Sequence, residues 1–131
     1  MHKSILIFLF SLSFAFSEDN SYSWVKKIPK PWVLSQKNLN TYLKNFHRKF
    51  PNFHDRLIAL NLWRIGTPYG IFCLGEERGV DKDPIIRIDT SDCTVHVLTT
   101  IAFAESKSFN EARHSMIKLH YKPGKNGEIE P

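Results

Sequence analysis

Residues 87–104 combine a polar turn, a cysteine and an apolar run long enough for a helix. Ser91 or Asp92 suits the N-cap position, because its side-chain oxygen can accept a hydrogen bond from a free N–H group of the first helical turn. Either choice places Cys93 in that turn, where the helix dipole and the unpaired N–H groups favour a thiolate. Cys93 is therefore a candidate nucleophile, and the alternative is a small apolar residue that packs in the core.

The length of 131 residues allows one domain, and the net charge of +5 suits anionic partners such as cell-wall polymers, nucleic acid or lipid headgroups. No stripe of Lys and Arg alternates with aromatic residues in a known nucleic-acid-binding pattern. We therefore expect a solvated basic face and no nucleic-acid partner.

Residues 1–17 have the form of a secretory signal, with a basic start, an apolar run, and Ala15 and Ser17 at the small positions before a cleavage site. The apolar run is shorter than the about 20 residues of a membrane span. We expect a signal peptide at 1–17, a domain at 18–131, periplasmic or secreted localisation, and no stable membrane insertion after cleavage. The alternative is an uncleaved anchor or a buried first helix.

Capping residues and apolar spacing predict three more helices. Ser35 begins one that ends near residue 50, Asn52 begins one at 53–64, and Ser108 with Glu111 forms a capping box for one that ends near residue 119. The first two look structural, and the Lys and Arg side chains of the first lie mainly on its outer face. Before these helices we expect an extended lead-in at 24–32 whose tryptophans pack on the core. The remaining segments are a turn at 66–70, a short strand at 71–74, a polar loop at 75–84 and a hairpin-like turn at 123–127.

His47 and His54 are seven residues apart, but Pro51 interrupts the helical register between them. We therefore expect surface histidines here, with no metal site and no cofactor.

Three segments in this order resemble a known family: residues 56–69, which end in Gly-Thr-Pro-Tyr, then Leu-Gly-Glu at 74–76, then Asp-Thr-Ser-Asp-Cys-Thr at 89–94. They are similar to the N-acetylmuramoyl-L-alanine amidase-like proteins, a bacterial branch of the NlpC-type, papain-fold cysteine hydrolases. The likeness runs from about Arg56 to Tyr121, half of the chain. It implies an α+β, papain-like fold, with an N-terminal helical half around the cysteine helix and a sheet that is mostly missing from this chain.

The resemblance also implies roles for individual residues. Cys93 would be the nucleophile, Tyr69 would lie near the thiol in the cleft, Asp92 would hold the turn before the nucleophile, and Thr67 would shape the loop that presents Tyr69. Proteins of this family cleave amide bonds of peptidoglycan stem peptides. The thiolate attacks the carbonyl, a histidine returns the proton to the leaving amine, and backbone N–H groups stabilise the oxyanion.

The family's histidine lies beyond the strand that begins near Tyr121, in an Arg-x-His-aromatic setting, and this sequence ends before it. His120 is the best substitute because it enters a strand after the nucleophile. His96 is expected in the core or a groove, and His114 on the surface. The alternative is that the base is absent and the chain is an inactive fragment.

The sequence thus predicts an exported cell-wall hydrolase that cleaves peptidoglycan with Cys93. Cys73 is expected to be a free packing thiol, and a redox-sensitive pairing with Cys93 is the alternative. One rival function is a secreted basic module that binds cell-wall polymer without catalysis, and another is an incomplete reading frame whose product does not fold. The amide bond that is cleaved and the oligomeric state are not specified.

Overall fold

The structure is a computed structural model that describes residues 19–74, 83–123 and 129–130, so the expected signal peptide lies outside the described residues. The described part is mostly helical, as expected for the helical half of the predicted fold. Its elements are α1 Asp19–Lys27, the 3-10 turn η1 Pro31–Val33, α2 Gln36–Lys49, α3 Phe53–Arg64, α4 Cys93–Glu105, α5 Phe109–His120, β1 Lys122–Pro123 and β2 Ile129–Glu130.

The capping residues begin α2, α3 and α5 where the sequence predicts. The Ser35 hydroxyl accepts from the Asn38 amide at 3.3 Å, and Asn52 Oδ1 accepts from the amides of the first turn of α3. Ser108 accepts from the Glu111 amide at 3.2 Å, while Glu111 Oε2 accepts from the Lys107 amide at 2.8 Å. Each cap satisfies N–H groups that have no partner within the helix, which is why local sequence locates these boundaries.

An aromatic cluster joins α1, α2 and α3. The fully buried ring of Phe46 lies with its centroid 5.1 Å from Trp24, 6.1 Å from Phe50 and 5.0 Å from Trp63. Trp63 Nε1 donates to the Pro29 carbonyl at 2.7 Å, which ties the proline-bearing lead-in to α3. The cluster is consistent with the predicted packing of Trp24, but the extended conformation predicted for 24–32 is wrong at its start. Helix α1 continues to Lys27, because the first proline comes two residues later.

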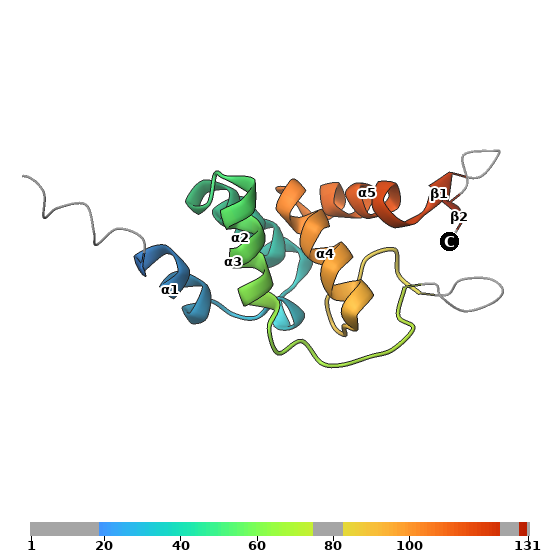
Figure 1. Cartoon of the computed structure of the whole chain (residues 1–131), viewed down its shortest axis with the longest axis horizontal. Helices are drawn as coiled ribbons and strands as arrows, with labels where there is room; N and C mark the ends of the chain where they lie inside the picture. The colour runs from blue at the N-terminus through green and yellow to red at the C-terminus, as the bar shows by residue number, and fades with distance from the viewer. Residues whose placement is uncertain (1–18, 75–82, 124–128, 131) are drawn as a thin grey trace, which may run out of the picture.

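Helix α4 lies between α3 and α5 (Figure 1). Its sequence is apolar nearly all round, which is the pattern of a helix buried on several sides. Its buried residues are Val95, Thr99, Thr100, Ala102, Phe103 and Ala104.

Two buried arginines of α3 bind main-chain carbonyls of α4. Arg56, at the start of α3, donates to the Ala104 carbonyl near the end of α4 at 2.7 Å. Arg64, at the end of α3, donates to the His96 carbonyl near the start of α4 at 3.0 Å. The two helices therefore run antiparallel. Arg56 also donates to the carbonyls that follow α2, those of Phe50 at 2.8 Å and Pro51 at 2.9 Å.

The short strand predicted at 71–74 is absent. Residues 71–74 form bends, and their neighbour Tyr69 contributes only an isolated bridge.

A pair of short strands lies at the end of the described chain, on either side of the predicted hairpin-like turn. Strands β1 and β2 pair antiparallel, with Lys122 opposite Glu130 and Pro123 opposite Ile129. The turn residues 124–128 between them lie outside the described residues. Within the described chain, no helix has the length and apolar character needed to cross a bilayer.

Replacing Phe46 with alanine tests the aromatic cluster. The substitution leaves a cavity among Trp24, Phe50 and Trp63, so we expect the free energy of unfolding to fall by about 3–5 kcal/mol. Urea denaturation followed by circular dichroism measures it. The matched control is Val33→Ala, at a side chain that is 67% exposed, which we expect to change the value by less than about 0.5 kcal/mol. Similar values for the two variants would contradict the assigned core.

Candidate functional site

Cys93 is the first residue of α4, and its side chain is exposed. Asp92 is the N-cap: its Oδ1 accepts from the Val95 amide at 2.8 Å, and its carbonyl accepts from the His96 amide at 3.0 Å. Ser91, the other capping candidate, does not cap the helix, because its hydroxyl donates to the Asp92 carbonyl at 3.0 Å. The structure thus presents the thiol to solvent at the positive end of a buried helix.

The start of α4 offers donors to an anion. Of the four N–H groups in its first turn, those of Val95 and His96 are used by Asp92. The amides of Cys93 and Thr94 make no hydrogen bond to any other described residue. Two free N–H groups beside a thiol are the arrangement that can stabilise an oxyanion formed on attack at a carbonyl.

The segment that carries Tyr69 is hydrogen-bonded to the residues before the thiol. The Ser91 amide donates to the Pro68 carbonyl at 2.8 Å, and the Gly70 amide donates to the Ser91 carbonyl at 3.2 Å, so Tyr69 and Ser91 form a parallel bridge. In Figure 1 this segment leaves α3 and passes below the start of α4. The structure therefore brings together Tyr69 and the cap of the Cys93 helix, and the Tyr69 side chain is 77% exposed.

Thr67 holds the turn that leads to Tyr69. Its hydroxyl donates to the Arg64 carbonyl at 2.6 Å, and its amide donates to the same oxygen at 3.1 Å. Gly66 precedes it with φ of +90°, a left-handed conformation that favours glycine. Thr67 thus ties the start of the loop to the end of α3.

Cys73 packs beneath the same loop. It is buried, its Sγ lies 3.6 Å from Thr90 Oγ1, and both Cys73 and Cys93 are free thiols in the structure. A Cβ atom on Gly70 would lie 2.9 Å from Cys73 Sγ and 3.0 Å from Thr90 Cβ. Only glycine fits at position 70 without displacing its neighbours.

Arg87 organises the segment before the cap. Its guanidinium pairs with Asp83 at 3.2 Å and Asp89 at 3.1 Å, and donates to the Cys73 carbonyl at 3.4 Å. The hydrogen bond with Asp89 is the main cause that raises the pKa of Arg87. These two ion pairs were not predicted from the sequence, although Asp83 and Asp89 lie within four residues of Arg87 and could have indicated them.

His96 is directed toward α3. Its Nε2 lies 2.9 Å from Asn61 Oδ1, and the Asn61 amide nitrogen donates to the Leu57 carbonyl at 2.9 Å. Since an amide oxygen only accepts, the assigned orientation of Asn61 places the ring proton on Nε2. Burial, and then the positive charge of Arg64, lower the pKa of His96. Its position agrees with the groove or core placement that the sequence predicts.

Arg64 is the most deeply buried charge near the site, with 1% of its surface exposed. Its Nη1 donates to the His96 carbonyl and, at 3.2 Å, to the Thr100 hydroxyl, whereas Nε and Nη2 have no partner among the described residues. Burial lowers its pKa to about 10. The apolar surroundings of α3 gave no sequence signal for this inward arginine.

The remaining histidines also bind elsewhere. His120 Nε2 lies 3.1 Å from the Leu74 carbonyl, and the exposed His114 bonds the Asn110 carbonyl through Nδ1 at 2.7 Å. In the described part of the chain, no hydrogen bond joins Cys93 to a histidine. The same residues contain no group of three His, Cys, Asp or Glu side chains able to hold a metal ion.

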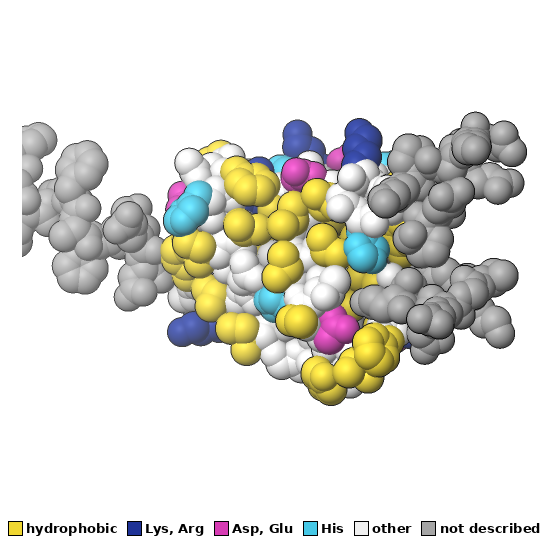
Figure 2. Space-filling model, turned by 45° about the vertical axis from the view of Figure 1, so that its right-hand side comes forward, with side chains coloured by type: hydrophobic (Ala, Val, Ile, Leu, Met, Phe, Trp, Pro, Cys, Tyr) yellow, Lys and Arg dark blue, Asp and Glu magenta, His cyan; other side chains and the backbone are white. Residues whose placement is uncertain are grey.

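Apolar side chains follow Tyr69 along the loop. Ile71 and Phe72 are 60% and 55% exposed, and Phe72 has φ of +53°, which is uncommon for a residue with a side chain. Figure 2 shows hydrophobic side chains gathered on the face that this view presents. The loop thus presents apolar side chains to solvent next to Tyr69.

Comparison of the chain with protein-family models, with curated proteins and with solved structures gave no match. A functional conclusion therefore depends on the geometry of the site itself.

Replacing Gly70 with alanine tests the link between the loop and the cap. The added Cβ meets Cys73 and Thr90, so we expect a loss of about 1–3 kcal/mol in the free energy of unfolding. Hydrogen exchange should also become faster at the amides of residue 70 and Ser91. The control is Ile71→Ala, at an exposed neighbour, and an equal effect in both variants would contradict the close packing.

The pH dependence of stability tests the environment of His96. Because its pKa is lowered in the fold, the stability that the neutral ring supplies is complete above the unfolded value of 6.5 and is lost as pH falls below it. Urea denaturation between pH 7.5 and 5.5, a range of about two units around the ordinary histidine pKa, should show this decline. In His96→Gln the decline should be smaller but not absent, because His47 also has a lowered pKa. An unchanged decline would contradict the assignment.

Proposed function

We propose that this protein is an exported cysteine hydrolase of the papain-like, NlpC type that cleaves amide bonds of peptidoglycan. The observation that carries the proposal is the exposed thiol of Cys93 at the first residue of α4, with the Tyr69 segment hydrogen-bonded to the residues just before it. The order of motifs in the sequence and the signal-like residues 1–17 support the same family and the same compartment.

In this proposal the chemistry begins with attack of the Cys93 thiolate on an amide carbonyl, which forms a carbon–sulfur bond. The oxyanion is stabilised by the free amides of Cys93 and Thr94. The carbon–nitrogen bond then breaks, the amine leaves with a proton, and water hydrolyses the thioester to a carboxylic acid and the free thiol. An imidazole must reach Sγ in the substrate complex to carry the proton, since catalytic hydrogen bonds often form only there.

Tyr69 and the apolar side chains after it are proposed to bind the stem peptide. The exposed ring of Tyr69 can pack against a peptide, and its hydroxyl can hydrogen-bond to it. Asp92 and Thr67 contribute indirectly, because their oxygen atoms hold the helix cap and the turn.

The reactivity of Cys93 gives the first test. We expect iodoacetamide to alkylate Cys93 in the folded chain faster than the same cysteine in urea at the same pH, because the proposed site activates this nucleophile only in the folded chain. Mass spectrometry of the two cysteine-containing peptides measures both rates. Cys73, which is buried, is the internal control and should react only in urea. Equal rates for folded and unfolded Cys93 would contradict an activated thiol.

Turnover gives the second test, measured as release of new amino groups from purified peptidoglycan. Cys93→Ala should abolish the release with little change in melting temperature, because the side chain is exposed. Asp92→Asn should retain activity, since asparagine caps a helix about as well as aspartate. A reactive Cys93 without release by the wild-type chain would favour the rival function, a non-catalytic module that binds cell-wall polymer.

A further inference from the structure

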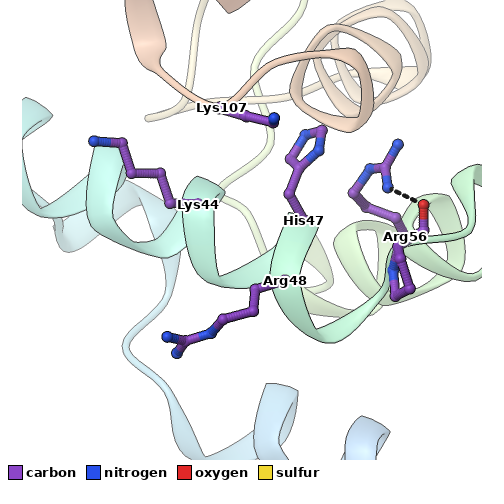
Figure 3. A pocket seen from close by; sticks show the side chains of 6 residues that line it. Lys44, His47, Arg48, Arg56 and Lys107 are labelled. Carbon is purple, nitrogen blue, oxygen red and sulfur yellow. Dashed lines mark hydrogen bonds between the residues drawn. The ribbon is translucent and has the colours of Figure 1, made fainter.

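A pocket of about 460 Å³ lies away from Cys93, where the end of α2 meets the start of α3 and the turn after α4. It is lined by Lys44, His47, Arg48, Pro51, Arg56 and Lys107 (Figure 3). Five of the six lining residues are basic and none is acidic. The sequence predicts Lys44 and Arg48 on an outer helix face and His47 on the surface, and only the fold places them around one hollow with Arg56 and Lys107.

Three of these side chains converge from different elements. Figure 3 shows the ring of His47 between the Arg56 guanidinium and Lys107, while Lys44 and Arg48 extend outward from α2. Arg56 is held in place because its Nε and Nη1 donate to main-chain carbonyls, including that of Pro51 at 2.9 Å. The inner end of the pocket is thus preorganised by contacts that also stabilise the fold.

The positive charge of the pocket is not neutralised by carboxylates. None of the ion pairs among residues 19–74 and 83–123 includes a lining side chain. Of the nearby acids, Glu105 accepts from the Ser115 hydroxyl. Glu111 accepts from the main-chain amide of Lys107, and in the described part of the chain it forms no ion pair with the ammonium group of that residue. His47 Nε2 is buried and, within the described residues, has no hydrogen-bond partner.

The titration of His47 agrees with this picture. Burial is the largest cause that lowers its pKa, and the charges of Arg56 and Lys107 lower it further, while backbone groups of Ser106 and Phe103 partly oppose them. Part of the charge also compensates the negative ends of α2 and α4. Nearby cations are enough to compensate the negative end of a helix. That role requires neither a pocket nor a histidine placed between two cations.

We propose that this pocket binds a phosphoryl anion, independently of the thiol site. A phosphate group carries about two negative charges and several acceptor oxygens. It can therefore accept from Lys107 and the free part of the Arg56 guanidinium at once, beside the His47 ring that lies between them, with Lys44 and Arg48 at the rim. A single carboxylate has fewer oxygens and half the charge, so it satisfies this arrangement less well. The phosphoryl group is that of a soluble phosphate or of a lipid headgroup.

The affinity test uses inorganic pyrophosphate titrated into the full chain at physiological ionic strength and followed by NMR. We expect saturable binding, and Lys107→Gln should weaken it by about tenfold or more, as is usual when a charged partner of an anion is removed. Lys118→Gln, on the exposed last turn of α5, makes the same charge change outside the pocket and should have less than a twofold effect. Equal weakening in both variants, or no saturable binding, would overturn the proposal.

A second readout separates a site from general attraction to a basic protein. Bound pyrophosphate favours the imidazolium form, so it should raise the pKa of His47. The exposed ring of His114 is the control, and its NMR resonances should respond far less to pyrophosphate. Similar shifts at both histidines would indicate screening at the surface and would overturn the proposal.

The source of the phosphoryl group is resolved with vesicles. Cosedimentation with phosphatidylglycerol vesicles but not with phosphatidylcholine vesicles, abolished by Lys107→Gln, identifies a lipid headgroup. Pyrophosphate binding without vesicle binding identifies a soluble phosphate.

Discussion

The packing of α4 between α3 and α5 is the constraint on which the rest of the structure depends. Because α4 is apolar on nearly every side, it must be covered along most of its length, and its first turn is among the parts that reach solvent. That turn carries Cys93. The same burial removes water from around the helix, which strengthens the effect of its unpaired N–H groups on a nearby anion.

Two arginines of α3 connect the hydrophobic core to the main chain of α4. Arg56 and Arg64 stand in the inward stripe of α3, beside Leu60 and Trp63, and bind carbonyls at opposite ends of α4. A buried guanidinium is costly unless its donors are satisfied. Arg56 meets this cost with main-chain acceptors at two helix ends, whereas Arg64 keeps two nitrogens without a described partner. The packing of α3 against α4 and the positions of these two charged side chains therefore depend on each other.

The two proposed sites use opposite ends of the same helix. At its start, free N–H groups, the Asp92 cap and the Tyr69 segment surround an exposed thiol suited to covalent chemistry. Beyond its end, the basic side chains of the pocket lie near the carbonyls that end the helix. They are more numerous than compensation of the negative helix ends requires. Chemistry at one end and anion binding at the other would allow the protein to act while held on a charged surface.

The sequence by itself determined the starts of α2, α3 and α5 and the position of Cys93, because caps at Ser35, Asn52 and Ser108 and apolar spacing act within a few residues. Helix α1 has no such signal and was not predicted. The sequence did not determine which side chains meet across the fold. The bridge between Tyr69 and Ser91, the inward arginines, the hydrogen bond of His96 to Asn61 and the basic pocket all join residues more than twenty positions apart or on separate elements. Such contacts depend on how the helices pack, and only the tertiary structure decided that packing.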